Sequence, residues 1–436
     1  MDKNKFAVNP PMGWNSWDCY GAAVTEKELR QNIDYMAENL KEHGWEYIVC
    51  DIQWYEPTAD SSRYNKFADL CMDEYGRLIP APNRFPSAAD GKGFTEIAAY
   101  AHEKGLKFGI HIMRGIPRQA VHQNTPVKGT NYTAREITHP ASVCAWNTDM
   151  YGLDTTKPGA QEYVNSIIEM YASWGVDFIK VDDICVKYGR CGDESSITYG
   201  GDEIELLRHA IDRTEREIVL SLSPGPAIVE QAEHLRKHAN MWRITNDFWD
   251  EWGTIMEMFS RCNNWSPYVS EGCFPDCDML PIGHISIKGC EHGLGERMTR
   301  FTKEEQRTMF TLWCIFRSPM MIGCELTDMD EWTKSLLMND EVLGLLKISR
   351  GAHQVLRTDD LIVWAAHDEQ GNQYVAMFNT INWANTYSLR LDQLGLEGKF
   401  AMHDMWENKE IGSVEDKIVT EITVHDAKLY RLTPVK

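Results

Sequence analysis

Along most of the chain, one pattern of hydrophobic and polar positions recurs: a stretch with helical spacing, a glycine, and a short continuous apolar run. It occurs in ENLKEHGWEYIVCD, AAYAHEKGLKFGIHI and MYASWGVDFIKVDD. The glycines, Gly44, Gly105 and Gly175, suit the C-terminal ends of helices, because glycine enters the left-handed conformation at little cost. The apolar runs do not alternate with polar residues, which is typical of parallel strands covered on both faces.

The same kind of run predicts about eight β-strands, each followed by a helix. The predicted strands are Met12–Trp14, Tyr47–Cys50, Phe108–Ile112, Phe178–Val181, Ile218–Leu222, Met241–Ile244, Phe274–Met279 and Pro319–Ile322. Capping-box pairs, Thr25 with Glu28 and Thr302 with Glu305, mark the starts of two helices. Residues 1–347 are therefore predicted to form an α/β domain, a (β/α)8 TIM barrel with long loops. The alternative, an open doubly wound sheet, lacks a GxGxxG loop after the first strand.

The pattern changes after about Ile348. Short apolar runs separated by Asp, Gly and Asn turns replace the helical spacing, as in DLIVWAAHDEQGNQYVAMFNT. This pattern predicts an antiparallel, all-β sandwich domain over residues 348–436. No low-complexity linker separates the two predicted domains, so we expect them to pack together.

Ionisable and aromatic residues gather at the C-terminal ends of the predicted strands, where barrel enzymes have their active sites. Taken alone, an aspartate after a strand is more often a helix N-cap, and Arg243 is as well explained by a structural ion pair. Lys180, inside an apolar strand, needs a carboxylate partner or a route to solvent. Together they favour a site. The residues at strand ends are Trp17, Asp18, Asp51, Trp54, His111, Arg114, Lys180, Asp182, Asp183, Ser223, Arg243, Asn246, Asp247, Asp250, Asp276 and Asp278.

Asp182 and Asp247 are the candidate catalytic pair. A buried ionised carboxylate such as one at the end of FIKVDD is costly unless it is paired. Two carboxylates that face each other across a cleft cleave a glycosidic bond, and strands four and six of a barrel bring these two across from one another. No HxH or HExxH motif offers metal ligands, so no metal is expected and a metal-dependent hydrolase is the weaker interpretation.

The composition and the start of the chain limit which binding partners and which cellular compartment we expect. The formal net charge of -21 argues against nucleic acid or an anionic membrane surface as a partner and fits a neutral small molecule; the candidate carboxylate pair makes a carbohydrate the expected one. No apolar run approaches the length of a membrane span. The start MDKNKFAVNPP has no signal-peptide core, so the chain as given is expected in the cytoplasm, or in the periplasm or outside the cell if a signal was removed. A homo-oligomer and a disulfide of Cys144 or Cys185 are left open.

Several of these motifs resemble glycoside hydrolase family 27, the α-galactosidase and α-N-acetylgalactosaminidase family. The resemblance runs through PPMGWNSWDCYGAAVTE, YIVCDIQW, GLKFGIHI, GVDFIKVDD, WRITNDFWDEW, CDML and SPMMIG, and so covers nearly the whole chain. It implies a retaining exo-glycosidase without a cofactor, in which Asp182 is the nucleophile and Asp247 the acid/base. It also implies sugar-binding roles for Trp17, Asp51, Lys180, Ser223, Arg243 and Met279. Trp54 and His111, from the strand ends, complete the candidate binding residues.

Where the family usually has two adjacent acids, this chain has Asp51 followed by Ile52. Terminal α-D-galactose is the expected substrate, but an apolar residue there also suits β-L-arabinopyranose, which lacks the C6 hydroxymethyl group. Gln53 or an acid from the long loop 113–154 is an alternative source of the missing contact. Ser223, in SLSPG, keeps α-N-acetylgalactosamine open. A catalytically inactive sugar-binding protein is the remaining alternative.

Overall fold

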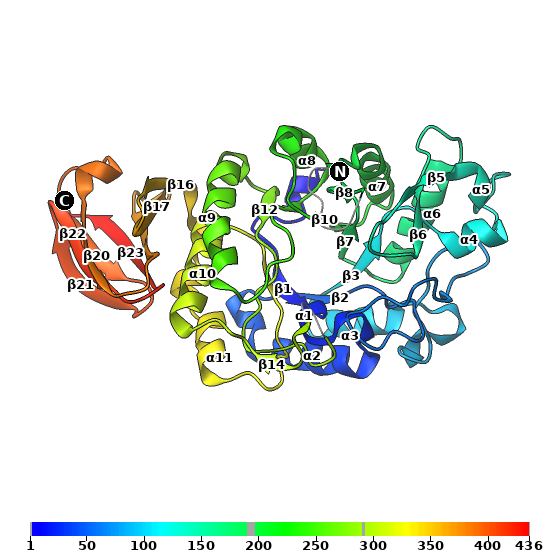
Figure 1. Cartoon of the computed structure of the whole chain (residues 1–436), viewed down its shortest axis with the longest axis horizontal. Coiled ribbons are helices and arrows are strands. Elements are labelled where there is room, and N and C mark those ends of the chain that lie inside the picture. The colour runs from blue at the N-terminus through cyan, green and yellow to red at the C-terminus, as the bar shows by residue number, and fades with distance from the viewer. Residues whose placement is uncertain (1, 190–196, 290–292, 436) are drawn as a thin grey trace.

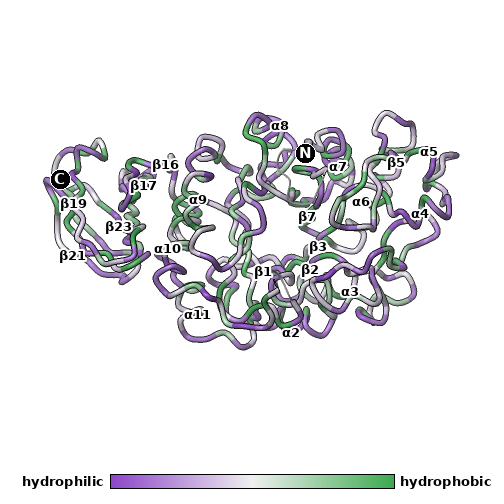
Figure 2. Tube along the Cα trace, in the orientation of Figure 1, coloured by the Kyte–Doolittle hydropathy of each residue, from purple (hydrophilic) through white to green (hydrophobic). Residues whose placement is uncertain are grey.

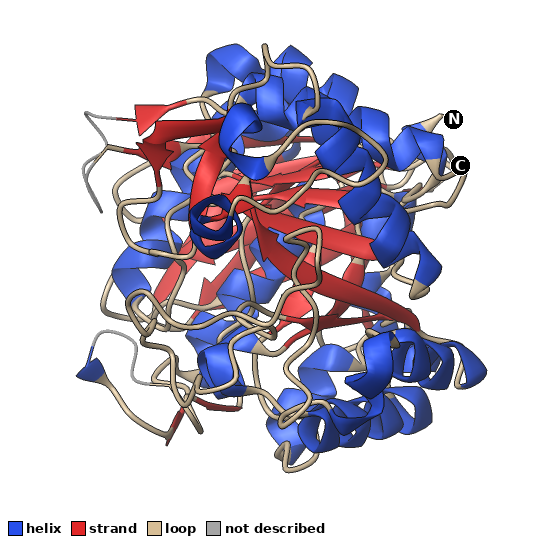
Figure 3. Cartoon of the chain, turned by 90° about the vertical axis from the view of Figure 1, so that its right-hand side faces the viewer, coloured by secondary structure: helices blue, strands red, loops and turns tan. Residues whose placement is uncertain are grey.

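A computed structural model describes residues 2–189, 197–289 and 293–435 of the chain. Its centre is an eight-stranded parallel sheet with the order β12-β11-β10-β7-β3-β2-β1-β15, which confirms the predicted α/β barrel. Figure 3 shows these strands in the middle of the molecule with helices around them. The strands are β1 (Met12–Asn15), β2 (Tyr47–Cys50), β3 (Lys107–Met113), β7 (Phe178–Asp182), β10 (Val219–Leu222), β11 (Met241–Arg243), β12 (Phe274–Asp276) and β15 (Met320–Ile322).

The two edges of this sheet meet just beyond β12. Leu280 forms a parallel bridge with Ile322, in which the Leu280 amide donates to the Met321 carbonyl at 2.8 Å and the Leu280 carbonyl accepts from the Gly323 amide at 3.0 Å. The strands therefore run in chain order round a closed ring, and their C-terminal ends share one rim, as a barrel requires. The predicted strand 274–279 is too long, because it ends at Asp276 and the chain reaches the bridge through Asp278 in the left-handed region, at φ 78°.

Helices on the outside of the barrel follow the predicted pattern, in which a glycine joins a helix to the next strand. Gly44, Gly105 and Gly175 all have positive φ, at 96°, 77° and 90°, as the turns from helix to strand require. Both predicted capping boxes form, at Thr25 and Thr302. The helices of this domain are α1 (Trp17–Tyr20), α2 (Glu26–Asn39), α3 (Thr95–Glu103), α6 (Ala160–Ser173), α7 (Gly201–Arg213), α8 (Ala232–His238), α9 (Trp252–Trp265), α10 (Lys303–Phe316), α11 (Glu331–Leu337), α12 (Asp340–Leu343) and α13 (Leu345–Ile348).

Three insertions in the barrel form small sheets of their own. The long segment between β3 and β7 folds into α4 (Arg118–Gln123), α5 (Ala134–Ile137) and an antiparallel sheet of β4 (Ile116–Pro117), β5 (Thr138–Val143) and β6 (Met150–Leu153). The other two are hairpin pairs, β8 (Lys187–Tyr188) with β9 (Ile197–Thr198) and β13 (His284–Ile285) with β14 (Arg297–Met298). The first insertion and the β8–β9 pair contribute side chains to the site described below.

The C-terminal domain is an antiparallel sandwich, as predicted. A six-stranded sheet of order β16-β17-β18-β23-β20-β21 faces a two-stranded sheet of β19 and β22 across a separate hydrophobic core. Figure 1 shows this domain beside α9 and α10, at one end of the molecule. Its strands are β16 (Arg350–Arg357), β17 (Leu361–His367), β18 (Gln373–Asn379), β19 (Asn385–Arg390), β20 (Phe400–Asp404), β21 (Lys409–Val414), β22 (Lys417–Ile422) and β23 (Ala427–Pro434).

Helices α9 and α10 hold the sandwich against the barrel. Arg307 of α10 donates to both carboxylate oxygens of Asp426, at 2.8 and 2.7 Å. The ring of His425 stacks on Trp252 of α9, with centroids 3.8 Å apart and planes 7° from parallel. The two domains therefore pack together without a linker, as expected from the sequence.

Hydrophobic stretches of chain lie along the barrel strands, and hydrophilic stretches lie in loops and on the outer faces of helices (Figure 2). Across the residues that the structure describes, every helix is too short or too polar to cross a bilayer. Cys144 and Cys185 are free thiols, so neither forms the disulfide that the sequence left open.

Candidate active site

A pocket of about 470 Å³ opens at the C-terminal ends of the barrel strands. This volume lies within the range of about 300–1,000 Å³ usual for small-molecule sites. Eight of the ten predicted catalytic and binding residues reach it from six different strands or the loops that follow them. The residues that line the pocket are Trp17, Asp18, Asp51, Ser62, Tyr64, His111, Trp146, Lys180, Asp182, Tyr188, Pro224, Arg243, Asn246, Asp247, Phe248, Trp249, Asp278 and Met279.

Asp182 lies at the end of β7 with three cations around it. His111 Nε2 lies 3.1 Å from its Oδ2, and the Asp183 amide donates to its Oδ1 at 2.7 Å. Burial alone would raise the pKa of the Asp182 carboxyl, but His111, Lys180 and Arg243 together lower this pKa below its ordinary value. Asp182 is therefore an ionised carboxylate at the pocket wall.

His111 and Asp51 continue this network along the pocket lining. His111 Nδ1 lies 2.7 Å from Asp51 Oδ2, so each ring nitrogen faces a carboxylate. Burial opposes a charge on His111, but Asp51 and Asp182 raise the pKa of its ring above the ordinary value. Asp51 Oδ2 also accepts from Asn15 at 2.8 Å and lies 3.9 Å from Lys180 Nζ. A charged imidazole can donate to both acids at once, which fixes their orientation.

Asp247 lies on the other side of Arg243. Arg243 is 5% exposed, forms an ion pair with Asp278 at 3.2 Å, and donates through its other terminal nitrogen to Asp247. The side chain of Asp247 is 68% exposed, whereas that of Asp182 is 12% exposed. One carboxylate is thus enclosed and surrounded by cations, and the other stands at the mouth of the same pocket.

An aromatic wall closes one side of the pocket. Trp17 stacks on Tyr64, with centroids 5.8 Å apart, and Tyr64 lies 5.5 Å from Trp146. Tyr64 and Trp146 come from the long loops after β2 and β3, so their place in the pocket could not be read from strand ends. A flat aromatic wall of this kind suits the apolar face of a sugar ring.

Asp18 is a pocket residue that the sequence analysis placed at a strand end without assigning it a role. It is 4% exposed, and its Oδ2 has no hydrogen-bond partner among the residues described. A side chain at Gly323 would collide with this oxygen, because a Cβ built there would lie 2.1 Å from it. Burial first, and then the nearby Asp278, raise the pKa of Asp18 well above its ordinary value. A neutral carboxylic acid here would both donate and accept hydrogen bonds.

Two predicted binding residues, Trp54 and Ser223, do not line the pocket. Trp54 is fully buried in an aromatic cluster with Tyr55, Phe94 and Trp174, and its indole donates to the His111 carbonyl at 2.8 Å. The expected contact between Trp54 and a sugar is wrong, because the Trp54 side chain turns away from the barrel axis. Ser223 is 1% exposed, and Pro224, the next residue, is the one that reaches the pocket.

The apolar residue after Asp51 is not replaced by another acid from the expected places. Ile52 is 1% exposed and belongs to the hydrophobic core. Gln53 donates to Asp149 at 2.5 Å, and both side chains are buried away from the pocket lining. Loop 113–154, all of it within the described residues, adds Trp146 to the pocket but no acid. Asp183, beside Asp182, forms an ion pair with Arg114 at 2.9 Å instead.

A parallel barrel with aspartates, an arginine and a lysine at its rim has the architecture and the side chains of a glycoside hydrolase. The family model described as alpha galactosidase A matches residues 9–156 and 149–347, and that of the alpha galactosidase C-terminal beta sandwich domain matches residues 358–432. The chain belongs to glycoside hydrolase family 27, the α-galactosidase (melibiase) family, as its motifs indicated.

Relatives of known name support the same class. The chain is 26% identical to an α-galactosidase of Oryza sativa subsp. japonica, over 99% of this chain and 86% of the relative. It is 54% identical to a family 27 β-L-arabinopyranosidase of Geobacillus stearothermophilus, whose crystal structure superposes with a TM-score of 0.97 over 100% of this chain and 98% of that one. A Bacillus halodurans protein, named as a candidate α-N-acetylgalactosaminidase, is 49% identical with a TM-score of 0.88, over 98% and 100% of the two chains.

Proposed function

We propose that this glycoside hydrolase is a retaining exo-enzyme that removes terminal β-L-arabinopyranosyl residues from oligosaccharides or glycoconjugates. The observation that carries the choice of sugar is Ile52, which occupies the place of the family's second acid and contributes no polar atom to the pocket. β-L-Arabinopyranose has the ring stereochemistry of α-D-galactose but no C6 hydroxymethyl group, so it needs no partner at that place.

The energetic argument is the cost of an unsatisfied hydroxyl. A galactoside would bring a C6 hydroxyl toward a wall where the expected carboxylate is missing, and a buried polar group without a partner costs about 1–3 kcal/mol. The pentopyranoside avoids this cost. That two family 27 structures at 53% and 54% identity are named β-L-arabinopyranosidases, one of them in complex with arabinose, supports the same choice.

The mechanism follows from the two carboxylates. Asp182, held ionised by His111 and Lys180, attacks the anomeric carbon while Asp247 gives its proton to the glycosidic oxygen, so the C–O bond breaks and the aglycone leaves as an alcohol. Water then attacks the glycosyl–Asp182 ester, and Asp247 takes a proton from it. The products are the free sugar with retained configuration and the original carboxylate.

The remaining pocket residues position the sugar. Arg243 contacts Asp247 and Asp278, so Asp247 exchanges its contact with Arg243 for one with the glycosidic oxygen when substrate binds. Lys180 and Asp51 face the sugar hydroxyls from below, and Trp17 offers its ring face. The loops that supply Tyr64 and Trp146 close the pocket at one side, which suits removal of a terminal residue.

A second candidate is terminal α-D-galactose. Relatives named α-galactosidases, at 26–27% identity, match nearly the whole chain. α-N-Acetylgalactosamine has weaker support in the pocket itself, because Ser223 is buried and does not line it.

Initial rates on p-nitrophenyl β-L-arabinopyranoside, α-D-galactopyranoside and α-D-N-acetylgalactosaminide test the proposal. We expect kcat/KM for the arabinopyranoside to exceed that for the galactoside by about 5–150-fold, the range that 1–3 kcal/mol gives. Equal or higher kcat/KM on the α-galactoside would reject the proposed sugar and leave the family assignment intact. No hydrolysis of any of the three would reject the enzyme itself in favour of a sugar-binding protein.

A further inference from the structure

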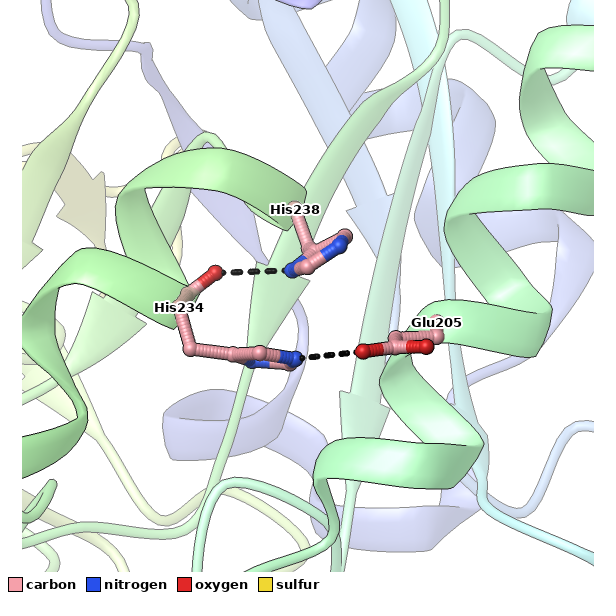
Figure 4. A group of neighbouring side chains, drawn as sticks. All are labelled: Glu205, His234 and His238. Carbon is pink, nitrogen blue, oxygen red and sulfur yellow. Dashed lines mark hydrogen bonds and ion pairs between the residues drawn. The ribbon is translucent and has the colours of Figure 1, made fainter.

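Three side chains with metal-ligand chemistry meet on the outer side of the barrel, away from the residues that line the pocket. Glu205 extends from α7, and His234 and His238 extend from α8 (Figure 4). The two histidines are four residues apart, so they share one face of their helix. Two imidazoles on a helix and one carboxylate from a neighbouring helix form a donor set that zinc binds in proteins.

The distances suit a single ion. His234 Nε2 lies 3.1 Å from Glu205 Oε1, and one donor atom from each of the three residues lies within 4.8 Å of the others. Bond lengths of about 2.1 Å place two donors of a tetrahedral zinc about 3.4 Å apart. Small rotations of the three side chains would therefore bring all three donors to one ion, with a fourth position for water.

The outer ring nitrogens are oriented as in metal sites. His238 Nδ1 lies 2.9 Å from the His234 carbonyl, an acceptor only, so Nδ1 carries the proton and Nε2 the lone pair. His234 Nδ1 lies 2.6 Å from the Tyr199 hydroxyl, which can accept its proton. Metal-binding histidines commonly donate their second nitrogen to a carbonyl or other acceptor in this way, and that contact fixes the tautomer.

We propose that Glu205, His234 and His238 bind a divalent transition-metal ion of the zinc type. The ion would join α7 to α8 and, through Tyr199, the end of β9, whose partner strand β8 carries the pocket residue Tyr188. Its role would be to hold this side of the pocket in place rather than to take part in bond cleavage, because none of its ligands lines the pocket.

Calorimetric titration of the chelator-treated, dialysed full-length protein with zinc chloride tests the proposal. We expect one equivalent of tight binding, lost in H234A and in E205Q, and a higher thermal midpoint in the presence of zinc. Y199F, which removes only the outer hydrogen bond, should weaken binding about 10–100-fold. Magnesium chloride, which prefers six oxygen ligands, should give no heat.

His209 offers the matched control, because it is an exposed histidine on the same helix α7 outside the cluster. H209A should bind zinc as the parent protein does. The chain also has 12 cysteines that bind zinc nonspecifically when exposed. Stoichiometric binding that persists in both H234A and E205Q would assign it to such thiols and overturn the proposal, as would the absence of stoichiometric binding in the parent protein.

Discussion

Replacing His111 by glutamine tests the charge network that keeps Asp182 ionised. His111 is 3% exposed and contacts Asp51 at 2.7 Å and Asp182 at 3.1 Å. Removing one member of a buried ion pair costs about 3–5 kcal/mol, and glutamine keeps one donor, so we expect a loss near the lower end. An unfolding entropy of about 2.1 cal/mol/K per residue gives about 0.9 kcal/mol/K for 436 residues, so Tm should fall by about 3–4 °C.

The same substitution should change the pH dependence of activity. His111 lowers the pKa of Asp182, so without it that pKa rises. The nucleophilic carboxylate is then protonated at a higher pH, and the acid limb of the kcat/KM profile moves toward neutral pH. The assay is a pH series of initial rates for the parent and H111Q, with H122Q, an exposed histidine on α4, as the control.

In H111Q, the Tm and the acid limb of the kcat/KM profile are both expected to change. An unchanged acid limb with a lowered Tm would make His111 a packing residue only. A Tm within 1 °C of the parent and an unchanged limb, roughly what a surface substitution gives, would refute the network altogether.

Two further changes test the pocket and the domain contact. D18N keeps the hydrogen-bonding capacity of a neutral acid and should retain kcat/KM within a few-fold. D18A loses one buried hydrogen bond, so it should raise KM about tenfold or more, with a smaller change in kcat. If D18N is as impaired as D18A, the carboxylate charge is needed. R307A leaves Asp426 buried and without its ion-pair partner, so it should lower the Tm measured by differential scanning calorimetry by a few °C. R390A, which removes an exposed arginine of the C-terminal sandwich, should not lower it. A Tm of R307A equal to that of R390A would contradict the domain contact.

The sequence predicts the barrel well because its strands are buried on both faces. Continuous apolar runs such as Tyr47–Cys50 and Phe178–Val181 have no exposed face, so the run itself marks the strand. The observed strands begin within a residue of the predicted ones. The sandwich is similarly predictable from its turns. The end of β12 is the exception. Asp278 there has a left-handed conformation and tertiary contacts, including a hydrogen bond that its carboxylate accepts from the Phe248 amide at 2.9 Å.

The site is predictable only where it lies on strands. Asp182, Lys180 and Arg243 follow from strand ends, because the parallel strands of a barrel end at one rim. Tyr64 and Trp146 come from loops whose path is set by long-range contacts that no local pattern records. Trp54 shows the opposite failure: it lies in the turn after β2, near a strand end, but that turn points its ring into an aromatic cluster.

The metal-ligand group shows a third limit. His234 and His238 are visible in the sequence as a pair with helical spacing, but such pairs are common on helix surfaces. The third donor, Glu205, lies on another helix, and only the packing of α7 against α8 brings it close.

Azide rescue of D182A tests the central claim most directly. Without added nucleophile, D182A should lose most activity on p-nitrophenyl β-L-arabinopyranoside, by about 10⁴-fold or more. Azide should then attack the anomeric carbon from the face that Asp182 left and displace p-nitrophenolate, giving the α-L-arabinopyranosyl azide of inverted configuration, identifiable by proton NMR. Near-native activity of D182A without azide, or an azide adduct of retained configuration, would contradict the assignment of Asp182 as the nucleophile.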